Sequence, residues 1–166
     1  MRRAGWLVMA VLIFTAACGR DEQPAVDQGP AEPPIPFERG TVVIQGARDT
    51  VRIAVEIAQT DEQRAYGLMR RPSLPEDAGM IFLYDQVQAP EGSFWMFNTL
   101  IPLDIAFIGE DGTIGSIVAM EPCQSPYPQW CPGYTANVPF QSALEVNRGF
   151  FERRGVGVGD RVVLER

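Results

Sequence analysis

The chain has 166 residues and a net charge of −7, and all 14 of its basic residues are arginine, with no lysine and no histidine. This composition excludes a Schiff-base lysine, an imidazole base and a histidine-ligated metal. The negative charge argues against nucleic-acid binding, because phosphate contacts need a basic surface. We expect no metal and no cofactor; calcium binding by carboxylates alone stays an alternative, although no EF-hand spacing occurs. Any cationic side chain in a functional site must be an arginine.

The N-terminus has the pattern of an export signal. Two arginines precede an apolar stretch over residues 5–17, which is shorter than the roughly 20 residues that a membrane span needs. The stretch ends in Thr15-Ala16-Ala17-Cys18, which resembles the lipobox of bacterial lipoproteins, although leucine is usual at the position of Thr15. The resemblance implies a signal peptide over 1–17 and a lipid anchor on Cys18. The alternative is an ordinary signal that is cleaved near Ala17.

Residues 18–40 are predicted to be a disordered tether between this anchor and a globular domain over 41–166. Residues 19–40 contain five prolines and no apolar periodicity. Gly19 stands where an aspartate would resemble an inner-membrane retention signal, so the outer membrane is the favoured destination, on the side facing the periplasm. The protein is then expected to contact a membrane through its lipid.

The cysteine count favours one disulfide. If Cys18 carries lipid, Cys123 and Cys131 remain as an even pair in an oxidising compartment. A redox or nucleophilic thiol is the alternative, but few groups in this composition could lower a thiol pKa.

Apolar runs and turn signals predict a mainly β domain. Alternation over 50–57 indicates a half-buried strand, and Thr60 with Gln63 resembles a capping box that begins a helix over 61–69. Asp111-Gly112 between two apolar runs predicts a hairpin. Further strands are expected at 41–46, 79–84, 93–98, 103–108, 113–119, 142–146 and 161–164, and a second short helix at 150–154. The fold class is mainly β (α+β), a small barrel-like or strongly curved sheet of seven to eight strands with two short helices.

The segment from Phe94 to Ile105 places polar side chains around a proline-containing connection between two apolar runs. Asp104 lies inside such a run, and a buried carboxylate needs a partner. Arg64, Arg70 and Arg71 are the candidate partners. Either the pair is structural or the segment forms a polar pocket.

Several ordered motifs resemble the prokaryotic family called domain of unknown function 192, over roughly residues 41–166. They are Arg64-x-x-Gly67-Leu68-Met69-x-Arg71, Gly79-Met80-Ile81-Phe82, Phe94-Trp95-Met96-x-Asn98-Thr99-x-x-Pro102-Leu103-Asp104, Pro122-Cys123, Ala143-Leu144-Glu145-Val146 and Gly159-Asp160. The resemblance implies no reaction, substrate or cofactor. Phe97 stands where the family usually has lysine, and the stretch between Cys123 and Tyr134 is enlarged.

Six of the matching residues are not explained by packing or turns, and they are the candidate binding site: Arg71, Trp95, Asn98, Thr99, Asp104 and Glu145. A second, aromatic patch is expected in the proline-rich loop, where Tyr127, Trp130 and Tyr134 either stack on a sugar or a partner or pack as a small core of their own.

Three functions remain open at this point. The favoured one is a non-catalytic envelope module that binds a glycan, a small anion or a protein partner. The second is a hydrolase or lyase of envelope polymers in which Asp104 and Glu145 act as acid and base. That reading requires the two carboxyls to flank one cleft. The third is an assembly lipoprotein without a small ligand, in which Arg71, Asn98 and Asp104 pair internally and leave no cleft.

Overall fold

The computed structural model of the chain describes residues 34–46 and 49–166. The predicted signal peptide, Cys18 and most of the predicted tether lie outside these residues. Nine strands, two α-helices and one 3-10 turn are present in the described part of the chain. In chain order they are β1 (Glu38–Gln45), β2 (Thr50–Ala58), α1 (Asp61–Tyr66), β3 (Ala78–Gln88), β4 (Ser93–Trp95), β5 (Leu103–Ile108), β6 (Ile114–Met120), η1 (Pro128–Trp130), β7 (Gly133–Thr135), β8 (Phe140–Asn147), α2 (Phe150–Arg154) and β9 (Arg161–Glu165).

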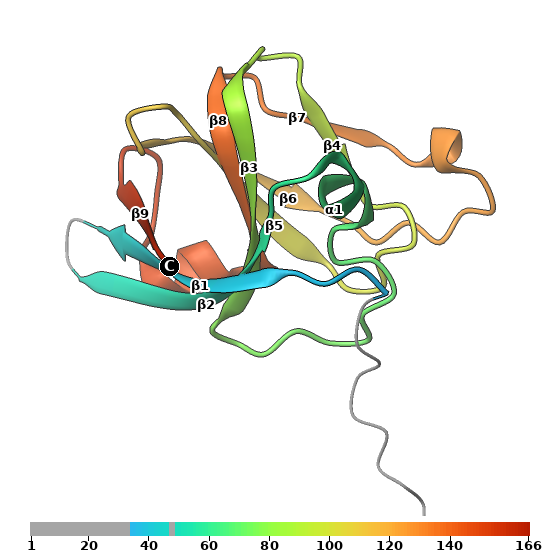
Figure 1. The fold of residues 1–166 in the computed structure, drawn as a ribbon, viewed down its shortest axis with the longest axis horizontal. Helices are drawn as coiled ribbons and strands as arrows, with labels where there is room; N and C mark the ends of the chain where they lie inside the picture. The colour runs from blue at the N-terminus through green and yellow to red at the C-terminus, as the bar shows by residue number, and fades with distance from the viewer. Residues whose placement is uncertain (1–33, 47–48) are drawn as a thin grey trace, which may run out of the picture.

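Seven strands form one curled sheet in the order β6-β5-β8-β3-β2-β1-β9, and β4 pairs with β7 in a small second sheet (Figure 1). The pair β2–β3 is parallel and is joined by the connection that contains α1, while the other pairs in the large sheet are antiparallel. This half-barrel confirms the predicted class of a mainly β, strongly curved sheet with two short helices.

Local signals account for most element boundaries. The capping box forms as predicted. The Gln63 backbone amide donates to the Thr60 hydroxyl, and the Gln63 side-chain carbonyl accepts from the Thr60 backbone amide. The predicted hairpin also forms: β5 and β6 pair around Gly112, whose φ is +80°. The helix is shorter than expected, because Gly67 has φ +52° and ψ −134° and ends it after Tyr66.

Three boundaries differ from the sequence-based expectation. The first strand begins at Glu38, three residues before the expected start of the domain at 41. The strand expected over 93–98 ends at Trp95, because Asn98 adopts a left-handed conformation with φ +55°. The short strand β7 was not expected, since it lies in the proline-rich loop and forms through its pairing with β4.

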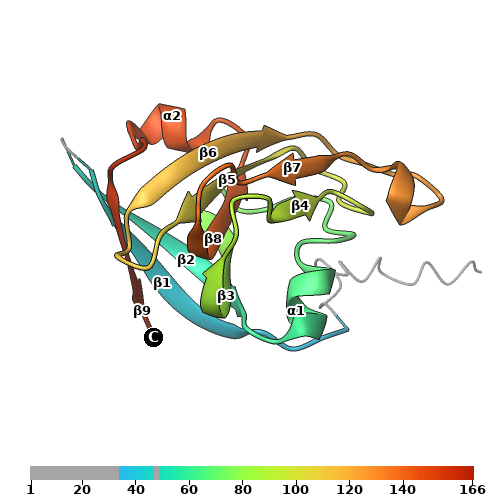
Figure 2. The same ribbon diagram turned by 90° about the horizontal axis from the view of Figure 1, so that it is seen from above.

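The large sheet separates two hydrophobic cores (Figure 2). The sheet curls over the first core, which contains α2 and side chains of β1, β2 and β9. The second core lies on the other face, beneath β4, β7 and the segment after α1. Because strand side chains alternate between faces, the buried apolar residues of the central strands β5, β8 and β3 divide between the two cores.

Among the described residues, no helix has the length and apolar character needed to cross a membrane.

Candidate functional site

Glu145 lies in the middle of the large sheet. It belongs to the central strand β8, where Met80 of β3 and Ile105 of β5 are its direct neighbours, and both are fully buried. Its side chain is on the face of the second core, and the residue is only 4% exposed. A carboxyl in this position is costly to ionise, because burial removes most of its hydration.

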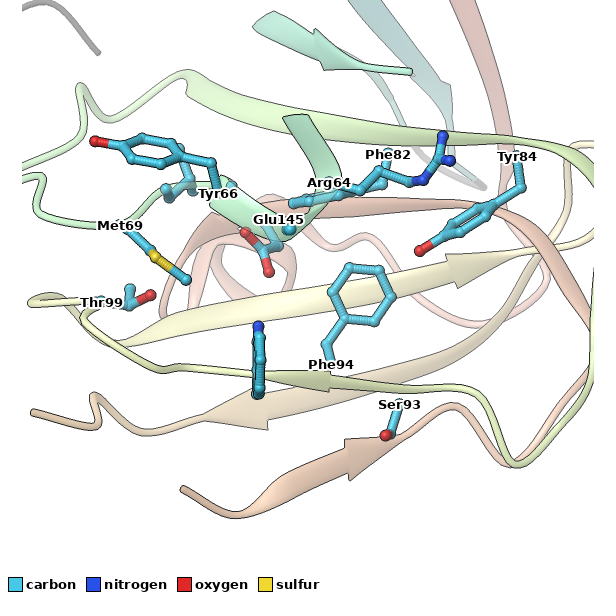
Figure 3. Close-up of a pocket in the computed structure, with 13 residues that line it drawn as sticks. Arg64, Tyr66, Met69, Phe82, Tyr84, Ser93, Phe94, Thr99 and Glu145 are labelled. Carbon is cyan, nitrogen blue, oxygen red and sulfur yellow. The ribbon is translucent and has the colours of Figure 1, made fainter. Parts of the chain in front are cut away.

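The Glu145 carboxyl points into a small cavity of about 100 Å³ above the second core. In Figure 3 the carboxyl lies in the centre of a ring that includes Met69, Thr99, Phe94 and Tyr84. Most residues of the wall are aromatic or apolar, although polar atoms make up most of the surface that lines the cavity. The wall comes from α1 and the segment after it, β3, β4 and the turn after β4. The full set of lining residues is Arg64–Met69, Phe82, Tyr84, Ser93–Trp95, Thr99 and Glu145.

Among the described residues no hydrogen bond or ion pair reaches the Glu145 carboxyl, and burial is the single cause of the shift in its pKa. Burial raises this pKa from 4.5 to about 8. Glu145 is therefore a neutral carboxylic acid at pH 7, able both to donate and to accept a hydrogen bond. On ionisation it would become a counter-ion facing the cavity.

Arg64 borders the cavity, but three of its five N–H donors are already used. One of its terminal nitrogens donates to the carbonyls of Gln59 at 2.7 Å and Leu83 at 2.8 Å, and the other pairs with Asp61. The guanidinium lies 4.9 Å from the centre of the Tyr84 ring. Arg64 thus fixes α1 against β3 and does not neutralise Glu145.

Tyr84 is the second titratable group in the wall whose pKa is shifted. Burial raises the pKa of its phenol above the ordinary value of 10, the Arg64 charge opposes this rise, and Glu145 adds to it. Tyr84 therefore stays protonated throughout the pH range in which Glu145 titrates.

Three of the six predicted site residues meet at this cavity. Trp95 and Thr99 line it together with Glu145. Thr99 is buried and its hydroxyl faces the same space (Figure 3), whereas Trp95 is 46% exposed and forms part of the rim. These three residues come from β4, the following turn and β8, which are distant in sequence.

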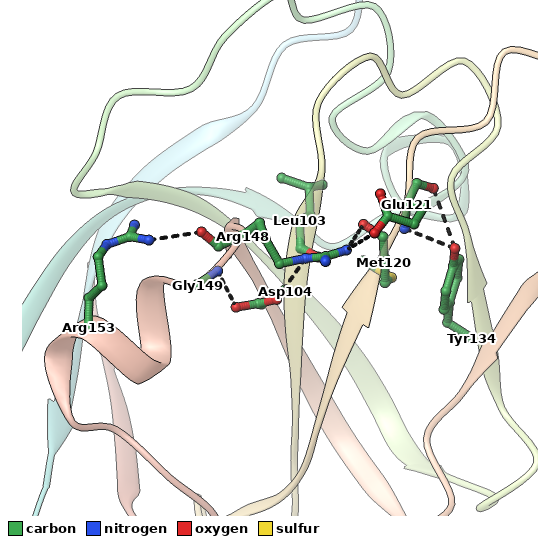
Figure 4. A network of polar contacts seen from close by, with 8 residues as sticks. All are labelled: Leu103, Asp104, Met120, Glu121, Tyr134, Arg148, Gly149 and Arg153. Carbon is green, nitrogen blue, oxygen red and sulfur yellow. Dashed lines mark hydrogen bonds and ion pairs between the residues drawn. The ribbon is translucent and has the colours of Figure 1, made fainter.

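Asp104 is placed elsewhere. It pairs across β5–β8 with Val146, whose side chain belongs to the first core, so its carboxyl lies on the opposite face of the sheet from Glu145. The Gly149 amide donates to it at 2.7 Å, and the Arg148 guanidinium lies 3.2 Å away (Figure 4). Burial raises the pKa of Asp104, and the Gly149 amide and Arg148 oppose that rise.

The partner of Asp104 is therefore Arg148, and not Arg64, Arg70 or Arg71 as the sequence suggested. Arg148 also donates to the Met120 carbonyl at 2.7 Å and to Glu121 at 3.0 Å. Because the sheet separates Asp104 from Glu145, the two carboxyls do not share a cleft. They cannot act together as the acid and base of one reaction.

Arg71 and Asn98 have structural roles outside the cavity. Arg71 forms a two-pronged, partly buried ion pair with Glu56, and one of the two bonds is 3.0 Å long. Asn98 supplies a left-handed turn and makes two backbone hydrogen bonds. Its backbone carbonyl accepts from the Arg70 backbone amide at 2.8 Å, and its backbone amide donates to the Cys123 carbonyl at 2.8 Å. These residues hold the segments that carry Leu68, Met69 and Thr99.

The proline-rich loop divides the predicted aromatic patch. Cys123 and Cys131 form the expected disulfide, with Cα atoms 5.8 Å apart. Tyr127 and Trp130 are 51% and 64% exposed. Their rings contact each other edge to face, with centroids 4.6 Å apart. Tyr134 instead packs against the second core, and its hydroxyl accepts from the Glu121 amide at 2.9 Å. It closes the chain of polar contacts that runs from Asp104 through Arg148 and Glu121 (Figure 4).

A second hollow of about 350 Å³ lies between β3, β8, β9 and the β5–β6 turn. Its polar lining residues are exposed or half-buried, among them Asp85, Glu110 and Gln141. Within the described residues no cluster of three acidic or cysteine side chains could hold a metal ion. The cavity at Glu145 is therefore the candidate site.

Sequence reasoning missed two walls of this cavity. Tyr84 was counted as the end of a strand, and Arg64 was considered only as a partner of Asp104. The capping box was the available signal for Arg64, because it predicts that this residue lies on a helix directly before the next strand.

The fold and this cavity define a small, mainly β domain built on a curled half-barrel. Residues 42–164 match the family model of DUF192, a family described as an uncharacterized ACR. The chain belongs to this family, as its motifs indicated. No curated protein matches the chain.

Two solved structures share the fold at 32% sequence identity. One, from Sinorhizobium meliloti 1021, is described as a "putative transcription regulator"; its TM-score is 0.70, and the match covers 78% of this chain and 96% of that one. The other, from Novosphingobium aromaticivorans DSM 12444, is a protein of unknown function with a TM-score of 0.65, and the match covers 87% and 99% of the two chains.

Proposed function

We propose that the domain is a non-catalytic binding module that takes a small ligand into the cavity above Glu145. The observation that carries the proposal is the buried carboxyl, which is 4% exposed, lacks a partner among the described residues and faces an open space. An unpaired buried polar group lowers the free energy of unfolding. A ligand that pairs with it recovers that cost and gains binding energy from the aromatic wall.

The arrangement of carboxyls supports binding over hydrolysis. Asp104 is held by Arg148 and the Gly149 amide on the other face of the sheet, and among the described residues that line the cavity Glu145 is the only acid. Acid–base cleavage of a glycosidic bond uses two carboxyls on either side of that bond. The internal pairs of Arg71 with Glu56 and of Asp104 with Arg148 agree with a purely structural protein. The open cavity at Glu145 favours a ligand.

We further propose that a lipid on Cys18 holds this module on a membrane surface facing the periplasm, at the outer membrane. The lipobox-like residues 15–18 support this location, and so does the Cys123–Cys131 disulfide, since disulfides persist in oxidising compartments. The net charge of −7 argues against a DNA-binding role for this chain.

The binding role is tested by thermal shift of the full chain against a panel of envelope glycan fragments, small anions and small amines. We expect at least one compound to raise the Tm of the wild type. Trp95→Ala removes the rim of the cavity and should abolish the shift. Trp130→Ala, an exposed tryptophan away from the cavity, is the matched control and should keep it. No shift with any compound, or equal shifts in Trp95→Ala, would refute the role.

The location is tested by fractionation of cells that express the wild type or Cys18→Ser. We expect the wild type in the membrane fraction and the variant released from it. A variant that stays in the membrane fraction would contradict the lipid anchor.

A further inference from the structure

We propose that the ligand taken by the cavity carries a small organic cation, an ammonium or alkylammonium group, and that Glu145 is its counter-ion. This inference rests on the proposed function and names the chemistry of the ligand.

The charges around the cavity favour a cation. The charged and titratable residues that line the cavity with Glu145 are Arg64 and Tyr66 from α1 and Tyr84 from β3. β4 contributes the uncharged Ser93, Phe94 and Trp95, and on β5 the neighbour of Glu145 is Ile105, since Asp104 is on the other face. Arg64 pairs with the exposed Asp61, and Glu145 is the acid among the lining residues, so its ionised form is the negative charge that a cation would meet.

The wall offers ring faces to a cation. Phe82 and Phe94 contact each other edge to face, with ring centroids 5.0 Å apart. Tyr84 and Trp95 complete the aromatic lining. The negative face of an aromatic ring attracts cations, most strongly where water is excluded. The Tyr84 ring already accepts the Arg64 guanidinium at 4.9 Å, so a cation is tolerated at this wall.

An anion is disfavoured by the same contacts. Three of the five Arg64 N–H donors are committed to the Gln59 and Leu83 carbonyls and to Asp61, which leaves Arg64 few donors for an anionic group. An anion would also require Glu145 to stay protonated. A neutral ligand could bind to protonated Glu145, but it would not benefit from ionisation of the carboxyl.

The size of the cavity suits a small cationic head group. Its volume is about 100 Å³, which leaves room for a compact head group. Trp95 at the rim is 46% exposed, so the remainder of a larger molecule could extend past it into solvent.

Proton release follows from the counter-ion role. With a pKa of about 8, Glu145 is mostly protonated at pH 7 and mostly ionised at pH 9. A cation that needs the ionised form should release about 0.9 proton per molecule bound at pH 7, and should bind about tenfold more tightly at pH 9. Tyr84 does not contribute, because its pKa is raised above 10.

The test is calorimetric titration of the full chain in mild detergent with three probes of similar shape and different charge: tetramethylammonium, tert-butanol and pivalate. Titrations at pH 7 in two buffers of different ionisation enthalpy give the number of protons released. The expected result is that tetramethylammonium binds best, releases a proton at pH 7 and gains about tenfold in affinity at pH 9.

Two variants separate the outcomes. Glu145→Gln keeps the shape of the side chain but cannot ionise, so it should lose tetramethylammonium binding and proton release. Asp85→Asn removes an exposed charge of the same sign on β3 and should change neither. If tert-butanol or pivalate binds better, or if the cation binds Glu145→Gln equally well, the cation inference is overturned while the cavity stays a ligand site. If none of the probes binds, the cation inference is overturned, and the thermal-shift panel decides separately whether the binding role fails as well.

Discussion

At the scale of single residues, the two buried carboxyls show how environment divides similar side chains into different roles. Asp104 is held by a backbone amide and an arginine, and Glu145 by neither. They are neighbours along adjacent strands, yet the alternation of β side chains puts them on opposite faces. Asp104 therefore stabilises the fold, whereas Glu145 is available to the cavity.

Glu145 should make the stability of the protein fall as the pH rises. The native pKa of about 8 exceeds the ordinary value of 4.5, so between these pH values the native state binds the proton and the unfolded state does not. The free energy of unfolding should drop by up to about 1.4 kcal/mol per pH unit across this window and level off above it. Urea unfolding at several pH values should show this slope in the wild type and not in Glu145→Gln. Parallel pH profiles would contradict the burial argument.

Asp104→Ala should lower the free energy of unfolding without weakening ligand binding. The substitution leaves the Gly149 amide and Arg148 without their partner, which typically costs about 1–3 kcal/mol. Urea unfolding gives the stability, and a cavity ligand found by thermal shift gives the binding. A stable variant that loses the ligand would show that Asp104 belongs to the site after all.

At the scale of elements, α1 connects sequence to site most directly. Its capping box is visible in the sequence, and the helix it begins supplies Arg64 through Tyr66 to the cavity wall. Gly67 then ends the helix near the Phe82 ring, where an added Cβ would lie 3.4 Å from that ring. The loop 123–131 is a second defined element, closed by its disulfide.

Thr60→Ala should destabilise the protein by about 1 kcal/mol, because the Gln63 amide loses its acceptor. The same change should weaken binding in the cavity, since α1 becomes less firmly placed. Ser73→Ala, an exposed hydroxyl in the connection after α1, is the control and should change neither quantity. Equal urea midpoints for Thr60→Ala and the wild type would show that the cap contributes nothing.

Replacing both Cys123 and Cys131 with serine should cost about 2–3 kcal/mol of unfolding free energy, as expected for closing a loop of this length. The cavity is lined by residues outside this loop, so the variant should keep its ligand. Denaturation of the variant and the wild type under the same conditions measures the difference. Loss of the ligand at unchanged stability would place the loop in the site.

At the scale of the whole molecule, the sequence predicted the class of fold and most strands, because apolar alternation and turn signals are local. It could not predict which strands become neighbours, and the site depends on that. Trp95, Thr99 and Glu145 were selected for their residue types, but only the order β5-β8-β3 and the position of β4 bring them together. The same topology gives Asp104 the partner Arg148, which follows β8 and has no signal of its own.

The central claim is that Glu145 is a buried, unpartnered acid facing a ligand cavity. Its most direct test is a carboxyl ¹³C NMR titration of the full chain, with the Glu145 signal assigned by its loss in Glu145→Gln. The structure predicts a midpoint near pH 8 in the free protein, which shifts to lower pH when a cationic ligand is bound. A midpoint near the ordinary value of 4.5 in the free protein would contradict the account.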